Sequence, residues 1–413
     1  MIAVAAARAV ATVLEGTSSV YVPTVDELIG DEGEFFGRYF NRSPLLRRAA
    51  LHGDPREILS VADLDEVLGS EAIRPPYLDI AKDGRQVPRS TYTKPIIVQG
   101  EYITDRVVPD SVTAHFRAGA TLTWNCLNHH RPGLRALAAE LSTMFATRSE
   151  VIAFLTPAGR RGLAPHYDPV DVFVVQLEGT KSWRVWPVPA QRRGDDAGNL
   201  DEAQLGTPAI EATLRPGDVL YMPYNCAHVA AAAGEQVSLH LSVTVEPRRW
   251  SRLLEQVVVR VLNEDPAFRG NPWLRGEDTP DGLSAMLTTL SKRLRDVDTA
   301  AEVERLIAEG VASDGVQVAH ELRDIAAADA IDADSLLARA ESVTVEVIQR
   351  TDDKVRASIG GAVYTLPTRV INALDTLDDG QPLPAGSLLT GASADLSTRT
   401  ARTLVRLGVL RVI

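Results

Sequence analysis

Two side chains that commonly bind metal ions stand one residue apart in the stretch PHYDPVDVFVVQLEG, namely His166 and Asp168. Alternate side chains of an extended chain point the same way, so both would lie on one face of the backbone. A third ligand must come from another segment, and His228 follows the strand-like stretch GDVLYMP. Two histidines and one carboxylate leave half of an octahedral coordination sphere open, which favours Fe(II) over tetrahedral zinc.

A pattern as short as His-x-Asp also occurs at strand ends that bind no metal. Lys181 adds to the metal hypothesis because it follows the apolar run FVVQLEGT. Iron oxygenases that use 2-oxoglutarate need a cation deep in an apolar pocket to pair with the distal carboxylate, and burying a cation without a partner is costly. The alternative is a lysine that faces solvent after the turn EGTK, and the residue types leave both open.

The segment that must position these side chains is rich in short strands. From about Val87 to about Val245, apolar runs alternate with Gly and Pro, and one predicted helix at 132–146 interrupts them. Many short strands at close intervals predict a sandwich or barrel rather than a parallel sheet with crossover helices.

The spacing of apolar residues changes at Trp250, and from there through Leu262 they recur at the spacing of a helix. We therefore expect a helical segment over 249–340, whose apolar stripe either packs into its own bundle or forms a dimer interface. Residues 341–413 are mixed and compatible with a small winged-helix unit. Arginines at 399, 402 and 406 on its last predicted helix are typical of a solvated face.

The length, net charge and cysteine content of the chain limit the classes of protein to which it can belong. A chain of 413 residues is long enough for more than one domain, and its formal net charge of −12 disfavours nucleic acid as the main partner. Cys126 and Cys226 lack CxxC spacing, so neither a disulfide framework nor a zinc–thiolate site is expected. Arg8 splits the first apolar stretch, which predicts an Ala-rich helix or a frayed terminus rather than an export signal, and no run is long enough to span a membrane. We expect a cytoplasmic protein.

Three stretches closely resemble the JmjC-type ribosomal oxygenases, a cupin-like branch of the 2-oxoglutarate and Fe(II) dioxygenases that hydroxylate ribosomal-protein side chains. They are TPAGRRGLAPHYDPVDVFVVQLEGTKSWRVWP, LRPGDVLYMPYNCAHVA and SLHLSVTV. The resemblance implies an α+β fold with a double-stranded β-helix (jelly-roll) core in residues 1–248, which also hold helical N-terminal elements. It further implies a helical dimerisation domain at 249–340 and a winged-helix-like domain at 341–413.

The resemblance also assigns roles to residues. It implies that His166, Asp168 and His228 bind Fe(II), that Lys181 binds the distal carboxylate of 2-oxoglutarate, and that O2 is the second cosubstrate. In SLHLSVTV the period of two places three side chains on one face that would line the pocket, with the serine as a second cosubstrate contact. These three are His240, Ser242 and Thr244.

The sequence departs from the family on the strand before TP. Relatives that hydroxylate ribosomal proteins usually have an Asn and a Tyr there, whereas this chain has Ile152 and Phe154. Ile and Phe offer no hydrogen bond to a polar substrate side chain, so a different substrate is expected.

The leading hypothesis is a homodimeric dioxygenase that hydroxylates a side chain of a ribosomal-protein-like target or of a peptide in natural-product biosynthesis. One alternative is a cupin-type isomerase or hydrolase with zinc or manganese, in which Lys181 would have no cosubstrate to bind. Another is a non-enzymatic DNA-binding regulator that uses the β-rich domain as a ligand sensor. The net charge of −12 disfavours that regulator.

Overall fold

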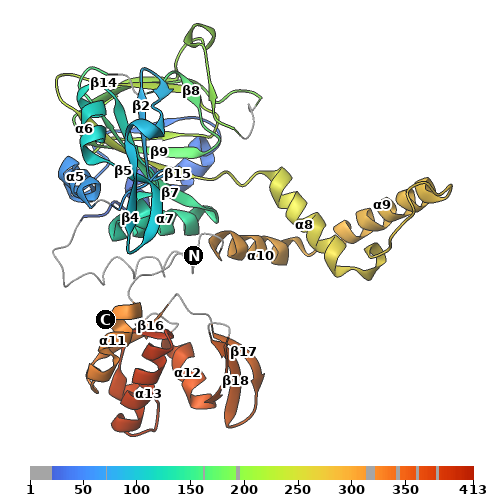
Figure 1. Cartoon of the computed structure of the whole chain (residues 1–413). Helices are drawn as coiled ribbons and strands as arrows, with labels where there is room; N and C mark the ends of the chain where they lie inside the picture. The colour runs from blue at the N-terminus through green and yellow to red at the C-terminus, as the bar shows by residue number, and fades with distance from the viewer. Residues whose placement is uncertain are drawn as a thin grey trace. The chain divides into compact units, whose positions relative to one another are not determined.

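The computed structural model describes residues 21–70, 72–160, 163–191, 196–312, 321–340, 345–359, 362–377 and 381–413. These residues fall into a larger unit, Val20–Asp314, and a smaller unit whose described residues begin at Glu321 (Figure 1). The Ala-rich helix expected at the N-terminus lies outside the described residues. No helix among the described residues is both long enough and apolar enough to cross a membrane.

The larger unit is built on two antiparallel sheets. Within the described residues, the major sheet has the strand order β1-β13-β9-β15-β7-β6-β2-β3, and the minor sheet has the order β11-β8-β14-β10-β12. The major-sheet strands are β1 (Leu45–Arg47), β2 (Leu78–Lys82), β3 (Arg85–Gln86), β6 (Thr121–Trp124), β7 (Ser149–Thr156), β9 (Asp171–Glu178), β13 (Val219–Met222) and β15 (Ser238–Val245). The minor-sheet strands are β8 (His166–Tyr167), β10 (Thr180–Val185), β11 (Gly198–Asn199), β12 (Ile210–Leu214) and β14 (His228–Ala233).

The two sheets pack face to face through apolar side chains. Val174 and Leu220 of the major sheet form one buried cluster with Trp183 and Leu214 of the minor sheet. Every residue of β9 from Asp171 to Leu177 is buried, as expected for a strand covered on both faces. The predicted α+β sandwich is confirmed.

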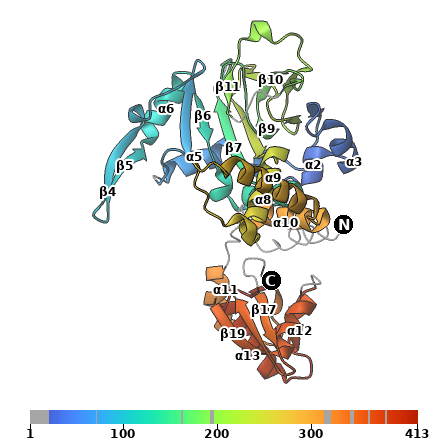
Figure 2. The ribbon, with the colours of Figure 1, turned by 90° about the vertical axis from the view of Figure 1, so that its right-hand side faces the viewer.

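Helices cover the outer face of the major sheet. The helix predicted at 132–146 is present as α7 (Pro132–Phe145), which begins with proline at a position where the missing N–H costs nothing. Its buried side chains join a large core with the major sheet. The remaining early helices are α2 (Val25–Ile29), α3 (Glu32–Glu34), α4 (Pro55–Ile58), α5 (Val61–Gly69) and α6 (Pro109–Arg117). A hairpin of β4 (Thr93–Val98) and β5 (Glu101–Val107) extends outward beside them (Figure 2).

The helices expected after Trp250 are α8 (Trp250–Glu264), α9 (Thr279–Arg295), α10 (Thr299–Ala312) and α11 (Glu321–Ala327). The helical prediction is wrong near its end, because Leu336–Arg339 forms strand β16 and pairs with β21 (Leu410–Val412). Pairing with a distant strand buries Leu337 completely and overrides local helix propensity. The stripe on α8 does not pack into a bundle within the described chain: Trp250 is 78% exposed and Leu254 57%.

The smaller unit has its own apolar core. Its further elements are β17 (Val345–Arg350), β18 (Lys354–Ile359), β19 (Ala362–Pro367), α12 (Thr368–Leu377), β20 (Leu383–Pro384) and α13 (Ala394–Arg406). The three arginines of α13 all contact groups of this same unit: Arg399 pairs with Asp395, Arg406 pairs with Asp329, and Arg402 donates to the carbonyl of Ile331.

Candidate metal centre and cosubstrate cavity

Strand pairing brings the three predicted metal ligands together. His166 on β8 lies directly opposite His228 on β14, and the centroids of the two rings are 4.2 Å apart. Oδ2 of Asp168 lies 3.7 Å from Nε2 of His166 and 3.6 Å from Nε2 of His228. One ligand atom from each residue lies within 4.8 Å of the other two, which is close enough to share one ion.

Backbone carbonyls fix the orientation of both rings. Nδ1 of His166 is 2.8 Å from the carbonyl oxygen of Ala164, and Nδ1 of His228 is 3.1 Å from that of Cys226. Because a carbonyl can only accept, each Nδ1 carries hydrogen and donates, which leaves the Nε2 lone pairs free to face Asp168. Burial, and then the electrostatic interaction with the neighbouring ring of His166, lowers the pKa of His228 to about 4, so its ring is neutral as a metal ligand requires.

The donor set fits a six-coordinate Fe(II) ion. Two imidazole nitrogens and one carboxylate oxygen come from one side and leave positions for small molecules, whereas a structural zinc site would be closed by four ligands. Asp168 is only half-buried, so the open side of the triad faces the cavity rather than packed protein.

A cavity of about 430 Å³ between the two sheets contains the triad. The register of β7 and β15 sets Phe154 opposite His240 and Ile152 opposite Ser242 on its wall. All of the residues singled out from the sequence line this one cavity: Ile152, Phe154, His166, Asp168, Lys181, His228, His240, Ser242 and Thr244.

Lys181 on β10 is buried, with 4% of its surface exposed, so the alternative of a solvent-facing lysine is wrong. Its Nζ lies 3.2 Å from Oγ1 of Thr156 and 3.5 Å from Nδ1 of His240. Burial lowers the pKa of Lys181 to about 7. Within the part of the chain that the structure describes, no carboxylate pairs with this ammonium, so the site lacks an anion that would stabilise its charge.

His240 completes the wall around Lys181. Its ring stacks on Phe154 with centroids 5.0 Å apart and planes 6° from parallel, and it meets the edge of Trp183 at 5.5 Å. Burial and the nearby charge of Lys181 hold the pKa of His240 well below its usual range. The ring is therefore neutral and does not compete with Lys181 for an anion.

Sequence reasoning missed Thr121, Thr123 and Trp183, which line the cavity, and Thr156, whose hydroxyl contacts Lys181. The period of two along β7 could have found Thr156, which follows Ile152 and Phe154 on the same face. Trp183 follows Lys181 by the same rule on β10. Thr121 and Thr123 lie on β6, which pairs with β7, and this pairing is not visible in the local sequence.

A family model described as JmjC domain matches residues 129–253. This range contains the triad, Lys181 and strands β7 to β15, whereas β2 and β6, which also contribute to the cavity wall, lie before it. Residues 129–253 are therefore similar to JmjC domains, as the resemblance to the JmjC-type oxygenases predicted.

Individual relatives agree with this class. The chain is 31% identical to ribosomal oxygenase 1 of Homo sapiens over 246 residues, which are 57% of this chain and 36% of that protein. It is 32% identical over 160 residues to the bifunctional lysine-specific demethylase and histidyl-hydroxylase NO66 of Drosophila persimilis, covering 38% of this chain and 23% of that protein. The predicted resemblance to ribosomal oxygenases is confirmed as a similarity over part of the chain, and the chain spans only 36% and 23% of these two relatives.

Solved structures share the fold. The X-ray structure of YcfD from Escherichia coli matches with a TM-score of 0.54 at 18% identity, covering 94% of this chain and 99% of that one. A structure of YcfD, described as a ribosomal oxygenase in complex with cobalt and 2-oxoglutarate, matches with a TM-score of 0.52 at 18% identity, covering 93% and 99%.

Proposed function

We propose that this chain is a 2-oxoglutarate- and Fe(II)-dependent dioxygenase that hydroxylates a side chain of a protein or peptide. The observation that carries the proposal is that a three-ligand metal site and a buried lysine without a carboxylate partner share one cavity. The relatives named ribosomal oxygenase, and the Escherichia coli protein that binds cobalt and 2-oxoglutarate, support the same chemistry.

His166 and His228 would hold Fe(II) through Nε2, and Asp168 would hold it through a carboxylate oxygen. When bound, the ferrous ion supplies activation of O2 coupled to decarboxylation of 2-oxoglutarate to succinate. The carbonyls of Ala164 and Cys226 keep both rings in the tautomer and orientation that binding requires.

Lys181 would bind the distal carboxylate of 2-oxoglutarate. Thr156 lies beside its ammonium and can donate a hydroxyl hydrogen to the same carboxylate. Ser242 lines the same cavity and is the further cosubstrate contact we propose. Because the surrounding wall is aromatic and buried, the ion pair would form away from water, where it is stronger than at a surface.

The substrate end of the cavity is apolar on β7. Ile152 and Phe154 line it and offer no hydrogen bond, in contrast to the Asn and Tyr usual in the family that this chain resembles. A site that lacks the Asn and the Tyr cannot use their hydrogen bonds to select a polar substrate side chain. We therefore propose a target other than the usual ribosomal residue, with a peptide from natural-product biosynthesis as the second candidate.

We further propose a homodimer formed through α8 and α9. Six large apolar side chains are exposed on these helices as the structure describes them, more than a solvated helix pair usually shows: Trp250, Leu254, Val259, Leu283, Met286 and Leu287. A second copy covering them would satisfy the apolar stripe. Leu254→Glu with Leu287→Glu should then produce a monomer by light scattering; an unchanged mass would place the interface elsewhere.

We also propose that the smaller unit, with its helices and antiparallel strands, is the winged-helix-like domain that the resemblance implies. Cys126 and Cys226, both among the described residues, form no disulfide, which suits the reducing cytoplasm that we propose as the location.

Mass spectrometry tests the proposed activity. Cell extracts are incubated with the protein, Fe(II), O2 and 2-oxoglutarate, and proteins and peptides are searched for a gain of one oxygen. We expect a modification that disappears without 2-oxoglutarate and in His166→Ala. Oxygen incorporation that persists in His166→Ala would contradict the proposal, as would a protein that binds no 2-oxoglutarate.

A further inference from the structure

A second group of metal-binding side chains lies outside the triad. Cys126 follows β6, His129 ends the short 3-10 helix η3 (Leu127–His129), and Glu150 is the second residue of β7. One ligand atom from each lies within 4.8 Å of the other two. The three side chains offer a thiol, an imidazole and a carboxylate, all ligands that Zn²⁺ accepts.

The cluster lies at the edge of the cavity-facing side of β7. Glu150, Ile152 and Phe154 are the half-buried residues of that strand and alternate with fully buried ones, so they share one face. The carbonyl oxygen of Glu150 accepts a hydrogen bond from Thr244, which lines the cavity. The cluster is thus a continuation of the cavity wall and shares no residue with the triad.

Neighbouring groups hold these side chains in place. The hydroxyl of Tyr77 lies 3.2 Å from Nδ1 of His129 and fixes its ring, as outer hydrogen bonds do for metal-binding histidines. Arg148 pairs with Oε1 of Glu150 and leaves Oε2 for another partner. The carboxylate of Glu150 and the thiol of Cys126 lie close enough together to interact.

We propose that Cys126, His129 and Glu150 form a second metal site, specific for a borderline divalent cation such as Zn²⁺. The thiolate, imidazole and carboxylate would supply three tetrahedral ligands, and water would supply the fourth. Binding breaks the S–H bond of Cys126, forms the sulfur–metal bond and releases the proton to solvent without any change in oxidation state. Sulfur distinguishes this site from the sulfur-free triad and favours zinc and cobalt over magnesium or calcium.

Titration of the full-length protein with Co²⁺ tests the site. A thiolate bound to Co²⁺ produces a charge-transfer absorption band in the near ultraviolet, and the triad cannot produce it. The chain has two cysteines, so Cys226→Ser is a matched control for Cys126→Ser. We expect the band in the wild-type protein and in Cys226→Ser, its disappearance in Cys126→Ser, and its loss when Zn²⁺ displaces the cobalt.

His129→Ala removes an exposed side chain and should leave the fold intact. We expect Co²⁺ to bind at least about tenfold more weakly to the cysteine of this variant. The proposal is overturned if the wild-type protein shows no band, if Cys126→Ser retains it, or if His129→Ala binds Co²⁺ as tightly as the wild type. None of these measurements depends on oxygenase turnover, so they can fail without affecting the proposed function.

Discussion

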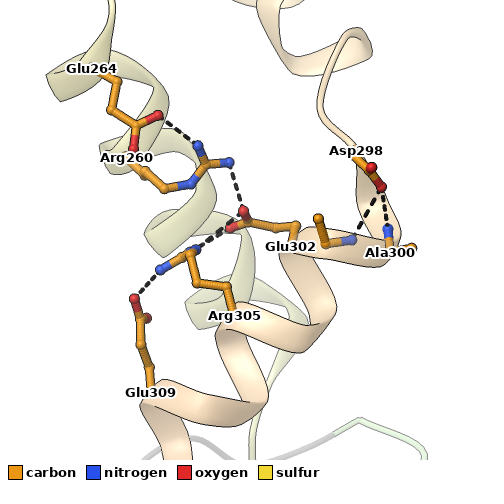
Figure 3. Close-up of polar contacts among 8 residues, drawn as sticks. Arg260, Glu264, Asp298, Ala300, Glu302, Arg305 and Glu309 are labelled. Carbon is orange, nitrogen blue, oxygen red and sulfur yellow. Dashed lines mark hydrogen bonds and ion pairs between the residues drawn. The ribbon is translucent and has the colours of Figure 1, made fainter. Parts of the chain in front are cut away.

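Two groups of cations in the larger unit differ in how their charge is compensated. Between α8 and α10, Arg260 pairs with Glu264 at 2.8 Å and with Glu302 at 2.7 Å, and Arg305 pairs with Glu302 and Glu309 (Figure 3). Lys181 is more deeply buried than either arginine, yet among the described residues no carboxylate pairs with its ammonium, which has Thr156 and His240 as polar neighbours. Carboxylates therefore neutralise both arginines, whereas none among the described residues neutralises Lys181.

Judged by volume alone, the hollow beside the arginine cluster would be a better candidate for a ligand site than the cavity that contains Lys181. The hollow beside the arginine cluster measures about 660 Å³, and the cavity that contains Lys181 about 430 Å³. A buried ammonium without a negatively charged partner destabilises the protein unless a ligand supplies the missing negative charge. We therefore infer the ligand site from uncompensated charge rather than from cavity volume.

The largest effect should come from the metal side of that cavity. His228→Ala removes one of the ligands, and loss of an outer-shell partner alone costs 10- to 100-fold in affinity or activity, so we expect at least a ~100-fold loss of Fe(II)-dependent succinate production. His52→Ala, which removes a histidine side chain that is 85% exposed, serves as the control. Turnover of His228→Ala within a few-fold of the control would exclude it as a ligand.

The next effect tests the uncompensated charge itself. Lys181→Met should weaken 2-oxoglutarate binding at least about 30-fold, since a buried charge pair that loses one partner costs about 2 kcal/mol or more. Calorimetry under anaerobic conditions measures this affinity, and iron binding should stay near that of the wild type. Arg305→Met is the matched control, because its cation is already paired with two carboxylates. Equal losses of 2-oxoglutarate affinity in Lys181→Met and Arg305→Met would contradict the difference that we infer between the two groups of cations.

The charge of Lys181 should also make cosubstrate binding depend on pH. Burial sets its pKa near 7 in the free protein, and a bound carboxylate would raise that pKa by stabilising the ammonium. The affinity for 2-oxoglutarate should therefore be constant below pH 7 and fall by up to about tenfold per pH unit above it. Lys181→Arg, which stays charged, should remove this dependence. A slope that persists in Lys181→Arg would assign the pH dependence to another group.

The smallest effect should come from the arginine cluster. Arg305→Ala breaks the pairs with Glu302 and Glu309, but Arg305 is about a third exposed, so solvent screens much of the loss. We expect about 1 kcal/mol of lost stability in denaturant unfolding and unchanged affinity for 2-oxoglutarate. A large loss of cosubstrate affinity would show that the two cation groups are coupled.

Short-range periodicity predicted much of this site. The period of two correctly grouped His166 with Asp168 and Ile152 with Phe154, because side-chain direction along a strand is a local property. The meeting of His166 with His228 depends on the pairing of β8 with β14, which spacing alone does not specify. The sequence left undecided whether Lys181 is buried, because its burial also depends on how the strands pair.

Long-range pairing also explains what the sequence concealed. Strand β16 was predicted as helix because its partner, β21, lies at the far end of the chain. Cys126 lacks a nearby second cysteine, and Glu150 reaches it only because β6 pairs with β7. Local motifs detect ligands that are adjacent in sequence and miss those that a sheet brings together.

A crystal structure of the protein loaded anaerobically with Fe(II) and 2-oxoglutarate, with anomalous data at the iron edge, tests the central claim most directly. We predict an iron peak within about 2.3 Å of Nε2 of both histidines and of an Asp168 oxygen, with the distal carboxylate of 2-oxoglutarate on Nζ of Lys181. An iron peak elsewhere, or 2-oxoglutarate bound with its distal carboxylate away from Lys181, would contradict it.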